Sequence, residues 1–271
     1  MAVQMFSQLV RLFDELRYEP TGKRIRALAD GHTVADTTAA VVVWEPRRVV
    51  PVYAVPAADL RGELLPAPAV DVPHRPARLR EGLPEVLTPS TGFGAHTTAG
   101  EALTLRTTGG DRVGAAFRPA DPDLAGFVLL DFDAFDWLEE DDAIVAHPRD
   151  PFHRVDIRHG SRHVRVERDG TVLAESGRPV LVFETSLPMR TYLPRDDVRI
   201  DLMEPSPTRT ACAYKGVASY LARSGTDLAW TYESPLPDAH ELAGLLCFFD
   251  ERVDVTVDGE ERPRPVTPWS D

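Results

Sequence analysis

The chain has 271 residues, of which 43% are apolar and 27% are charged, and its net charge is −13. This length allows two modest domains with their own cores. A strongly negative protein repels nucleic-acid backbones and anionic membranes at long range, so we expect neither as a partner. No apolar run approaches the roughly 20 residues of a membrane span. The N-terminus lacks a secretory pattern, so we expect a cytoplasmic protein whose two cysteines are reduced thiols.

The first 21 residues are predicted to contain an amphipathic helix. Between residues 5 and 17, five apolar side chains recur at helical spacing: Phe6, Leu9, Val10, Phe13 and Leu16. The charges on the opposite face nearly balance. This balance favours docking onto the protein's own domain over lying on a membrane surface.

The chain is predicted to be an internal duplication. Residues 30–45 align without gaps on residues 169–184, with 6 identities in 16 positions. Each segment begins with Asp-Gly, a turn signal, and ends in a buried apolar strand followed by glutamate. We therefore expect a first, diverged copy at 22–146, a linker at 147–159 and a second copy at 160–259. A Pro-rich, frayed tail would follow at 260–271.

Each copy is predicted to contain short strands and one short helix. The helices would start near Asp121 and Asp238, where an acidic residue suits a helix N-terminus. In the second copy, apolar residues from Leu242 to Val253 would line one face of that helix. The first copy also carries residues 66–89, rich in Pro, Ala and Arg, which predict an irregular surface loop.

The segment at 210–220 is the strongest candidate site. It holds Lys215, one of only two lysines among 30 basic residues, three positions after Cys212. A lysine in an arginine-rich chain offers a compact charge or a tunable amine, so Lys215 is a candidate ligand contact or catalytic group. Cys212 is a candidate nucleophile if its surroundings favour the thiolate. The alternative is a small buried residue at the start of a strand.

Other second-copy residues could complete a pocket. Glu184 recurs as Glu45, and a residue shared by both copies is expected to serve the fold, for instance by pairing with an arginine. If Glu184 faces a pocket, it could instead act as a general base beside Cys212. Five aromatic residues could form a ligand-binding wall or could be ordinary core residues: Tyr192, Tyr214, Tyr220, Trp230 and Tyr232.

We predict no metal and no cofactor. His153, Asp156, His159 and His163 are spaced unlike a helical histidine pair or a paired-cysteine site, so a solvated linker is favoured. Asp131 and Asp133 form a D-x-D pair that could hold magnesium. No phosphate-binding glycine loop precedes them, so they are read as a solvated acidic helix end.

The second copy resembles a bacterial and fungal family known as domain of unknown function 427. The resemblance rests on an ordered series of motifs: Phe183-Glu184, Tyr192-x-Pro194, Cys212-x-Tyr214-Lys215-Gly216 and Ala229-Trp230-x-Tyr232. It implies a tandem, mainly β (α+β) protein with two β-tent-like domains of antiparallel sheets, each with one short helix. Many proteins of that wider fold hold zinc through paired CxxC motifs, which this chain lacks.

The leading functional hypothesis is a protein that binds an unknown small molecule in its second domain. It could be an enzyme that uses the thiol or amine of Cys212 and Lys215, with Glu184 on the opposite wall. The first alternative is a non-catalytic interaction or scaffold protein, and a homo-oligomer is possible. A second, weaker alternative follows from a nucleotidyltransferase-like label that the family has carried. Only the second copy is expected to keep a working pocket.

Overall fold

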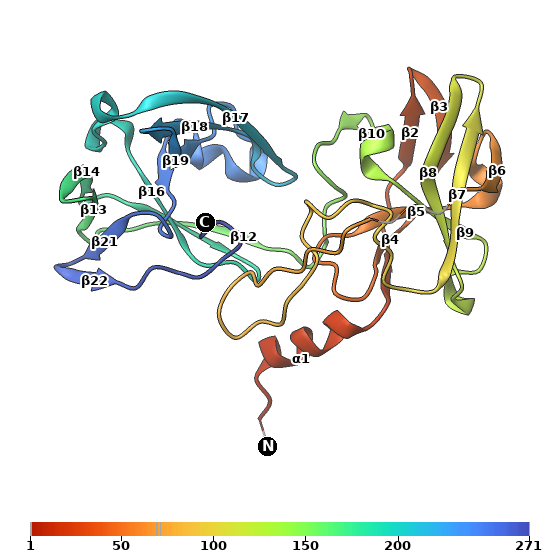
Figure 1. The fold of residues 1–271 in the computed structure, drawn as a ribbon, viewed down its shortest axis with the longest axis horizontal. Coiled ribbons are helices and arrows are strands. Elements are labelled where there is room, and N and C mark those ends of the chain that lie inside the picture. The colour runs from red at the N-terminus through yellow and green to blue at the C-terminus, as the bar shows by residue number, and fades with distance from the viewer. Residues whose placement is uncertain (1, 69, 71, 271) are drawn as a thin grey trace. The chain divides into compact units, whose positions relative to one another are not determined.

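The computed structural model describes residues 2–68, 70 and 72–270. The chain forms two compact units, one of Met1–Ala77 with Pro84–Asp150 and one of Arg78–Leu83 with Pro151–Asp271. Both units consist mainly of antiparallel β-sheet, as predicted (Figure 1). Within the described residues, no helix combines the length and hydropathy needed to cross a bilayer.

The first unit contains a large sheet and a small sheet. The large sheet has the order β1 (Arg17–Pro20), β4 (Val41–Trp44), β5 (Val52–Pro56), β9 (Phe127–Leu130), β8 (Gly110–Pro119), β7 (Gly100–Thr107) and β6 (Glu63–Pro66). The small sheet has the order β11 (Asp142–Ala143), β10 (Asp136–Glu139), β2 (Ile25–Ala29) and β3 (His32–Thr37).

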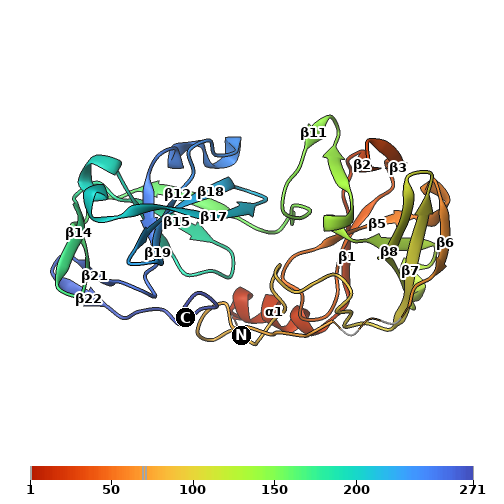
Figure 2. The same ribbon diagram turned by 45° about the horizontal axis from the view of Figure 1, so that its top comes forward.

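The second unit repeats this arrangement strand for strand. Its large sheet has the order β12 (Val155–His159), β15 (Val180–Glu184), β16 (Arg190–Leu193), β20 (Leu246–Phe248), β19 (Thr226–Thr231), β18 (Gly216–Arg223) and β17 (Glu204–Cys212). Its small sheet, visible in Figure 2, has the order β14 (Thr171–Ser176), β13 (Val164–Arg168), β21 (Asp254–Val257) and β22 (Glu260–Arg262). The duplication predicted from sequence is therefore also a duplication of topology.

The two predicted Asp-Gly turns close equivalent hairpins. Asp30 and Gly31 join β2 to β3 with φ values of 49° and 78°, and Asp169 and Gly170 join β13 to β14 with φ values of 51° and 71°. Both positions of such a turn require left-handed backbone, which glycine and aspartate adopt more readily than most residues.

The main core of each unit lies between its two sheets. In the first unit this cluster takes Ile25 from the small sheet and Val42 from the large sheet, and in the second it takes Val164 and Leu193 in the same way. A further buried cluster, the outer cluster, covers the other face of each large sheet. Four of the eight predicted site residues belong to or pack against this cluster in the second unit.

Apart from the N-terminal helix, the helical structure of the described residues consists of short 3₁₀ segments. The segments are η1 (Leu12–Asp14), η2 (Ala57–Asp59), η3 (Pro122–Leu124), η4 (Phe132–Ala134), η5 (Arg195–Asp197), η6 (Ile200–Leu202) and η7 (Pro237–Leu242). The helices predicted near Asp121 and Asp238 are η3 and η7. The predicted apolar helix face beyond Leu242 is wrong, because Leu246–Phe248 is the buried strand β20. A short continuous apolar run fits a buried strand and a helix equally well.

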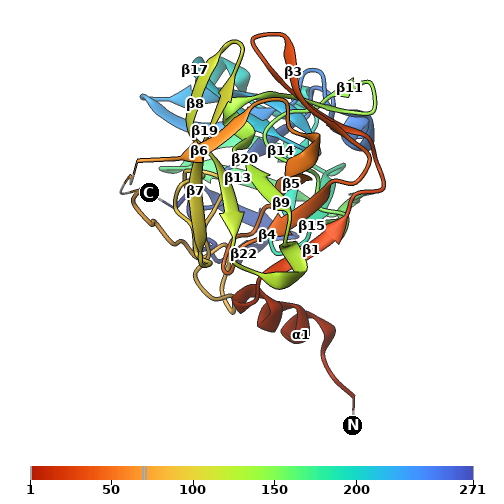
Figure 3. The ribbon, with the colours of Figure 1, turned by 90° about the vertical axis from the view of Figure 1, so that its right-hand side faces the viewer.

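The N-terminal helix is shorter than the predicted 5–17. Helix α1 (Met5–Arg11) ends before η1, and the chain then enters β1, which pairs with β4 (Figure 3). No residue of α1 is buried. Leu16, after the helix, packs partly against the outer cluster of the first unit.

Two segments predicted to be irregular are ordered. Residues 155–159, within the predicted linker, form β12 and pair with β15. In the tail, which was expected to fray, β22 pairs with β21 and the buried Thr267 donates a hydrogen bond of 2.6 Å from its hydroxyl to Glu251 Oε1. The predicted acidic helix end at 131–136 is also absent, because η4 leads directly into strand β10.

The outer strand β17 contains two prolines. Pro205 and Pro207 flank Ser206, and the pairing of β17 with β18 shifts register between Ser206 and Arg209. The strand lies at the end of the large sheet in the second unit.

Candidate functional site

The centre of the candidate site is the tip of the hairpin between β17 and β18. Cys212 pairs with Gly216 across the hairpin, and the intervening Ala213, Tyr214 and Lys215 are all buried. Gly216 has φ of 95°, and a Cβ there would lie 3.4 Å from Leu236 N. A larger residue at this position would be strained by its φ and tightly packed.

A buried ion pair joins this tip to the end of β15. The ammonium group of Lys215 contacts Glu184 Oε1, and the two side chains are 9% and 7% exposed. Burial opposes both charges, but the opposite charges stabilise each other. The contacts with Lys215 and His153 outweigh burial and lower the pKa of Glu184 to about 2. Burial likewise acts against Lys215, but Glu184 and Cys212 raise its pKa.

This pairing limits the chemistry of both side chains. At neutral pH Lys215 is an ammonium, which has no lone pair for nucleophilic attack. Glu184 is a carboxylate whose low pKa makes it a weak base. The pair is therefore suited to binding or orienting polar groups rather than to transferring protons itself.

His153 is a third member of the site that the sequence analysis assigned to the linker. Its Nε2 lies 3.7 Å from Glu184 Oε2, beyond hydrogen-bonding distance. Its ring stacks on Tyr214, with 4.4 Å between ring centroids and an angle of 21°. The buried Nε2 has no hydrogen-bond partner in the described part of the chain. If residues 155–159 had been predicted as a strand that pairs with β15, His153 would have been expected close to Glu184.

The two cysteines differ in access. Cys212 is half-buried and forms no hydrogen bond with the residues that the structure describes. Cys247 is fully buried in the outer cluster, and burial raises the pKa of its thiol. Of the two, only Cys212 is placed to react with a molecule that arrives from solvent.

Four of the five predicted aromatic residues gather in one cluster. Tyr192, Trp230 and Tyr232 are buried there and Tyr220 packs partly against them. Trp230 Nε1 donates a hydrogen bond of 3.0 Å to the hydroxyl of Tyr192, and the Tyr220 hydroxyl lies 2.7 Å from Thr210 Oγ1. The fifth, Tyr214, stacks on His153 instead.

Tyr232 differs from these neighbours in its hydroxyl group. Burial raises the pKa of Tyr232, and the nearby groups Cys212 and Glu184 raise it further. Within the described residues, its hydroxyl makes no hydrogen bond, although the side chain is buried. The hydroxyl oxygen itself is not fully buried, so it is available to bind another molecule.

The first unit uses Glu45 differently from Glu184. Glu45 Oε2 lies 3.0 Å from His96 Nδ1, and Oε1 accepts hydrogen bonds of 3.0 and 3.3 Å from the backbone amides of Thr97 and Thr98. The guanidinium of Arg48 lies 3.7 Å from Glu45. In both units the glutamate after the buried strand thus ties down the segment that precedes β7 or β18.

The other histidines near the linker have separate partners. His159 Nε2 lies 2.8 Å from Glu241 and His163 Nε2 lies 3.0 Å from Glu175, while Asp156 pairs with two arginines, Arg154 and Arg158. Among the residues that the structure describes, no three His, Cys, Asp or Glu side chains are grouped to hold a metal ion.

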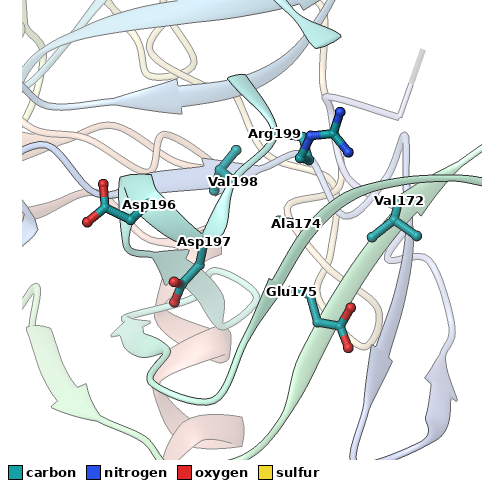
Figure 4. Close-up of a pocket in the computed structure, with 7 residues that line it drawn as sticks. All are labelled: Val172, Ala174, Glu175, Asp196, Asp197, Val198 and Arg199. Atoms are coloured by element: carbon teal, nitrogen blue, oxygen red, sulfur yellow. The ribbon is translucent and has the colours of Figure 1, made fainter. Parts of the chain in front are cut away.

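The surface groove shown in Figure 4 lies elsewhere. It has a volume of about 340 Å³ and lies where β14 meets η5, with Glu175 on one side and Asp196 and Asp197 on the other. None of the predicted site residues lines it.

Comparison with known proteins gave one family. A family profile described as a domain of unknown function (DUF427) matches residues 17–72 and 156–259. These two segments fall in the first and second units and agree with the tandem arrangement. No curated protein matches the chain.

Proposed function

The chain belongs to the family described as a domain of unknown function (DUF427), and we propose that its second unit binds a small molecule beside the Lys215–Glu184 pair. Such a molecule would contact the ammonium group of Lys215, the hydroxyl of Tyr232 and the ring of His153. The thiol of Cys212 would lie next to it.

The observation that carries this proposal is a difference between equivalent rows of side chains on the outer faces of the two large sheets. In the first unit, paired residues across the strands are Val41, Ala54, Leu129 and Phe117. In the second unit, the equivalent strands β15, β16, β20 and β19 place Val180, Tyr192, Cys247 and Trp230 in register. A row without polar side-chain atoms is sufficient to cover the sheet of the first unit, so the polar atoms of Tyr192, Cys247 and Trp230 in the second unit require another explanation, and ligand binding supplies one.

The hydrogen-bonding capacity of the site supports the same conclusion. His153 Nε2 has no partner among the described residues, and neither has the Tyr232 hydroxyl. Buried polar groups usually have hydrogen-bond partners, and an unpaired one such as His153 Nε2 costs about 1–3 kcal/mol, whereas the Tyr232 hydroxyl is not fully buried. A ligand with hydrogen-bond acceptors would satisfy both Lys215 and Tyr232.

If the protein is an enzyme, Cys212 is the group that would form a bond to the substrate. Its thiolate is the nucleophile, and Lys215 would hold a negatively charged substrate group beside it. A reactive thiol needs a reducing compartment, so this proposal places the protein in the cytoplasm.

Native mass spectrometry of the gently purified full chain tests the binding proposal. We expect a co-purified small molecule, and we expect Tyr232→Phe to lose it, because that change removes only the hydroxyl. Tyr18→Phe, at a half-exposed tyrosine of the first unit, is the matched control. A wild-type protein without ligand, which is also not stabilised by any member of a metabolite library, would contradict the proposal.

Alkylation with iodoacetamide tests the role of Cys212. We expect Cys212 to react and Cys247 to stay unmodified in the folded protein. Lys215→Met should slow the reaction of Cys212 at least several-fold, whereas Lys23→Met in the first unit should not. Equal rates in all three proteins would remove Cys212 as an activated nucleophile while leaving the binding proposal in place.

The second candidate function is an interaction protein, and one observation favours it. Met5 is 67% exposed on α1, and Leu9 and Leu12 near it are about half exposed. Apolar side chains in such positions are typical of contact surfaces. Deleting residues 1–11 and measuring the mass in solution by light scattering tests this function. An unchanged mass would remove self-association through α1.

A further inference from the structure

A surface groove lies beside the small sheet of each unit, and the two grooves share two equivalent lining positions, Thr33 with Val172 and Arg61 with Arg199. In the first unit, Arg61 N donates a hydrogen bond of 2.8 Å to Val34 O, and in the second, Arg199 N donates one of 2.8 Å to Leu173 O. The bridges next to these bonds, Ala35 with Leu60 and Ala174 with Val198, are also equivalent. The duplication therefore produced the same backbone arrangement around Arg61 and Arg199, although most other lining residues of the two grooves are not equivalent.

The two grooves differ in size and charge. The groove of the first unit has a volume of about 750 Å³, and its charged lining residues are Arg61 and Arg106, with His32 close by. No carboxylate lines it. The groove of the second unit is about 340 Å³ and is lined by Glu175, Asp196 and Asp197.

The arginines of the two grooves also differ in their partners. The Arg199 guanidinium is occupied by both oxygens of Asp201, at 2.9 and 2.7 Å. The guanidinium of Arg61 makes no ion pair or hydrogen bond with any described residue. Arg106 is held in place by Asp111 at 3.0 Å and by Glu63 at 3.4 Å. Arg61 is thus free of such contacts, whereas the guanidinium of Arg106, like that of Arg199, is already occupied by carboxylates.

The walls of the first groove supply further donors and a close backbone approach. The hydroxyls of Thr33 and Thr108 make no hydrogen bond within the described residues. Gly62 lies so close to β7 that a Cβ there would fall 2.4 Å from Arg106 O. A side chain at position 62 would therefore force the β6 side of the groove away from Arg106.

We propose that this groove of the first unit binds the phosphate group of a small phosphomonoester. The free guanidinium of Arg61 and the two threonine hydroxyls can donate hydrogen bonds to a phosphate group. The nearby carboxylates Asp30, Glu63 and Asp111 are each paired with an arginine, Arg112 or Arg106. The site is separate from the one proposed in the second unit and does not depend on it.

Amide chemical shifts of the full-length protein test this site. Inorganic phosphate is added at constant ionic strength, with sodium chloride as the control salt. We expect saturable shifts at Gly31, Gly62 and Thr108, with a Kd on the order of 1 mM. Phenyl phosphate should bind at least several-fold more tightly than inorganic phosphate if the groove accepts an organic phosphomonoester. Equal affinities would show that only the free phosphate ion is bound.

Variants of the two grooves decide the outcome. Arg61→Gln should weaken phosphate binding by about tenfold or more, because a hydrogen-bonded charge is lost. It should leave the fold intact, since Arg61 makes no ion pair or hydrogen bond with the described residues and only attracts Asp36 at longer range. Arg199→Gln in the second groove should have no effect. Equal losses in the two variants, or shifts that chloride reproduces, would overturn the proposal.

Discussion

The two units show how one topology can carry two different polar interiors. Glu45 in the first unit is held by backbone amides and His96, whereas Glu184 in the second is held by the side chain of Lys215. Backbone amides are present whatever residues occupy the loop, so the first arrangement requires only the glutamate and a loop of the correct shape. The second requires a lysine at one particular position. The comparison teaches that the carboxylate belongs to the shared fold and that Lys215 is what distinguishes the second unit.

The largest expected effect is that of removing Lys215. Lys215→Met leaves Glu184 buried without its cation, which should lower the free energy of unfolding by about 3–5 kcal/mol. Lys23→Met breaks the more exposed pair with Glu139 in the first unit and should cost at most about 1 kcal/mol. Urea denaturation measures both.

A double variant sharpens this result. Lys215→Met combined with Glu184→Leu removes both charges and should recover most of the lost stability. A double variant as unstable as Lys215→Met alone would show that the lysine acts through packing and not through charge.

Acid should act on the second unit through Glu184. Its pKa is lowered to about 2 in the folded protein, so its contribution is complete above the unfolded value near 4.5 and is lost as the pH falls toward 2. The loss should be on the order of 3 kcal/mol. Glu184→Gln should flatten this part of the curve of unfolding free energy against pH. An unchanged slope between pH 4.5 and 2 would contradict the charged pair.

The C-terminal segment should contribute a smaller amount. Arg190 forms hydrogen bonds of 3.0 and 2.6 Å with Glu251, and Thr267 donates to the same carboxylate. Thr267→Val should lower the free energy of unfolding by about 1.5 kcal/mol, as a hydrogen bond to a charged group is lost. Thr97→Val, which removes a hydroxyl bonded to Pro46 O in the first unit, is the matched control with a cost of about 1 kcal/mol. No loss on Thr267→Val would indicate that the tail detaches in solution.

The smallest expected effect has the opposite sign. Burial raises the pKa of Asp250 to about 6, although Arg190 acts against it. A carboxyl group with a raised pKa stabilises the fold below its unfolded value of 3.8, and this stability is lost as the pH rises through 6. Asp250→Asn should therefore increase stability at pH 8. Because Asp250 is 22% exposed, the gain should be about 1 kcal/mol. A decrease at pH 8 would show that the charge of Asp250 is needed beside Arg190.

Local patterns were sufficient to predict the framework of both units. The Asp-Gly turns and the strand Val41–Trp44 were predicted because their conformation depends on residues adjacent in the chain. The run at Leu246–Phe248 was misread as helix because its neighbours β16 and β19 come from distant parts of the sequence. Pairing with these strands, and not any local preference, determines its conformation.

The candidate site could be predicted only in part for the same reason. Lys215 and Glu184 were singled out separately by rarity and by repetition, but their contact spans 31 positions of the chain. His153 was missed because the alternation of apolar and polar residues in β12 was not recognised as a strand, and its approach to Glu184 depends on the pairing of that strand with β15. The unpaired hydroxyl of Tyr232 likewise depends on the packing of several strands, and no local sequence pattern predicts it.

The two prolines of β17 have a consequence for how the protein behaves at high concentration. An end strand of a sheet offers unpaired amide groups to which a strand from another molecule can add. Proline has no amide hydrogen, and the register shift after Ser206 bends the strand further from an ideal ladder. The edge strand β17 is thereby protected against the addition of strands from other molecules. Replacing both prolines with threonine should make β17 the strand most prone to start fibril formation.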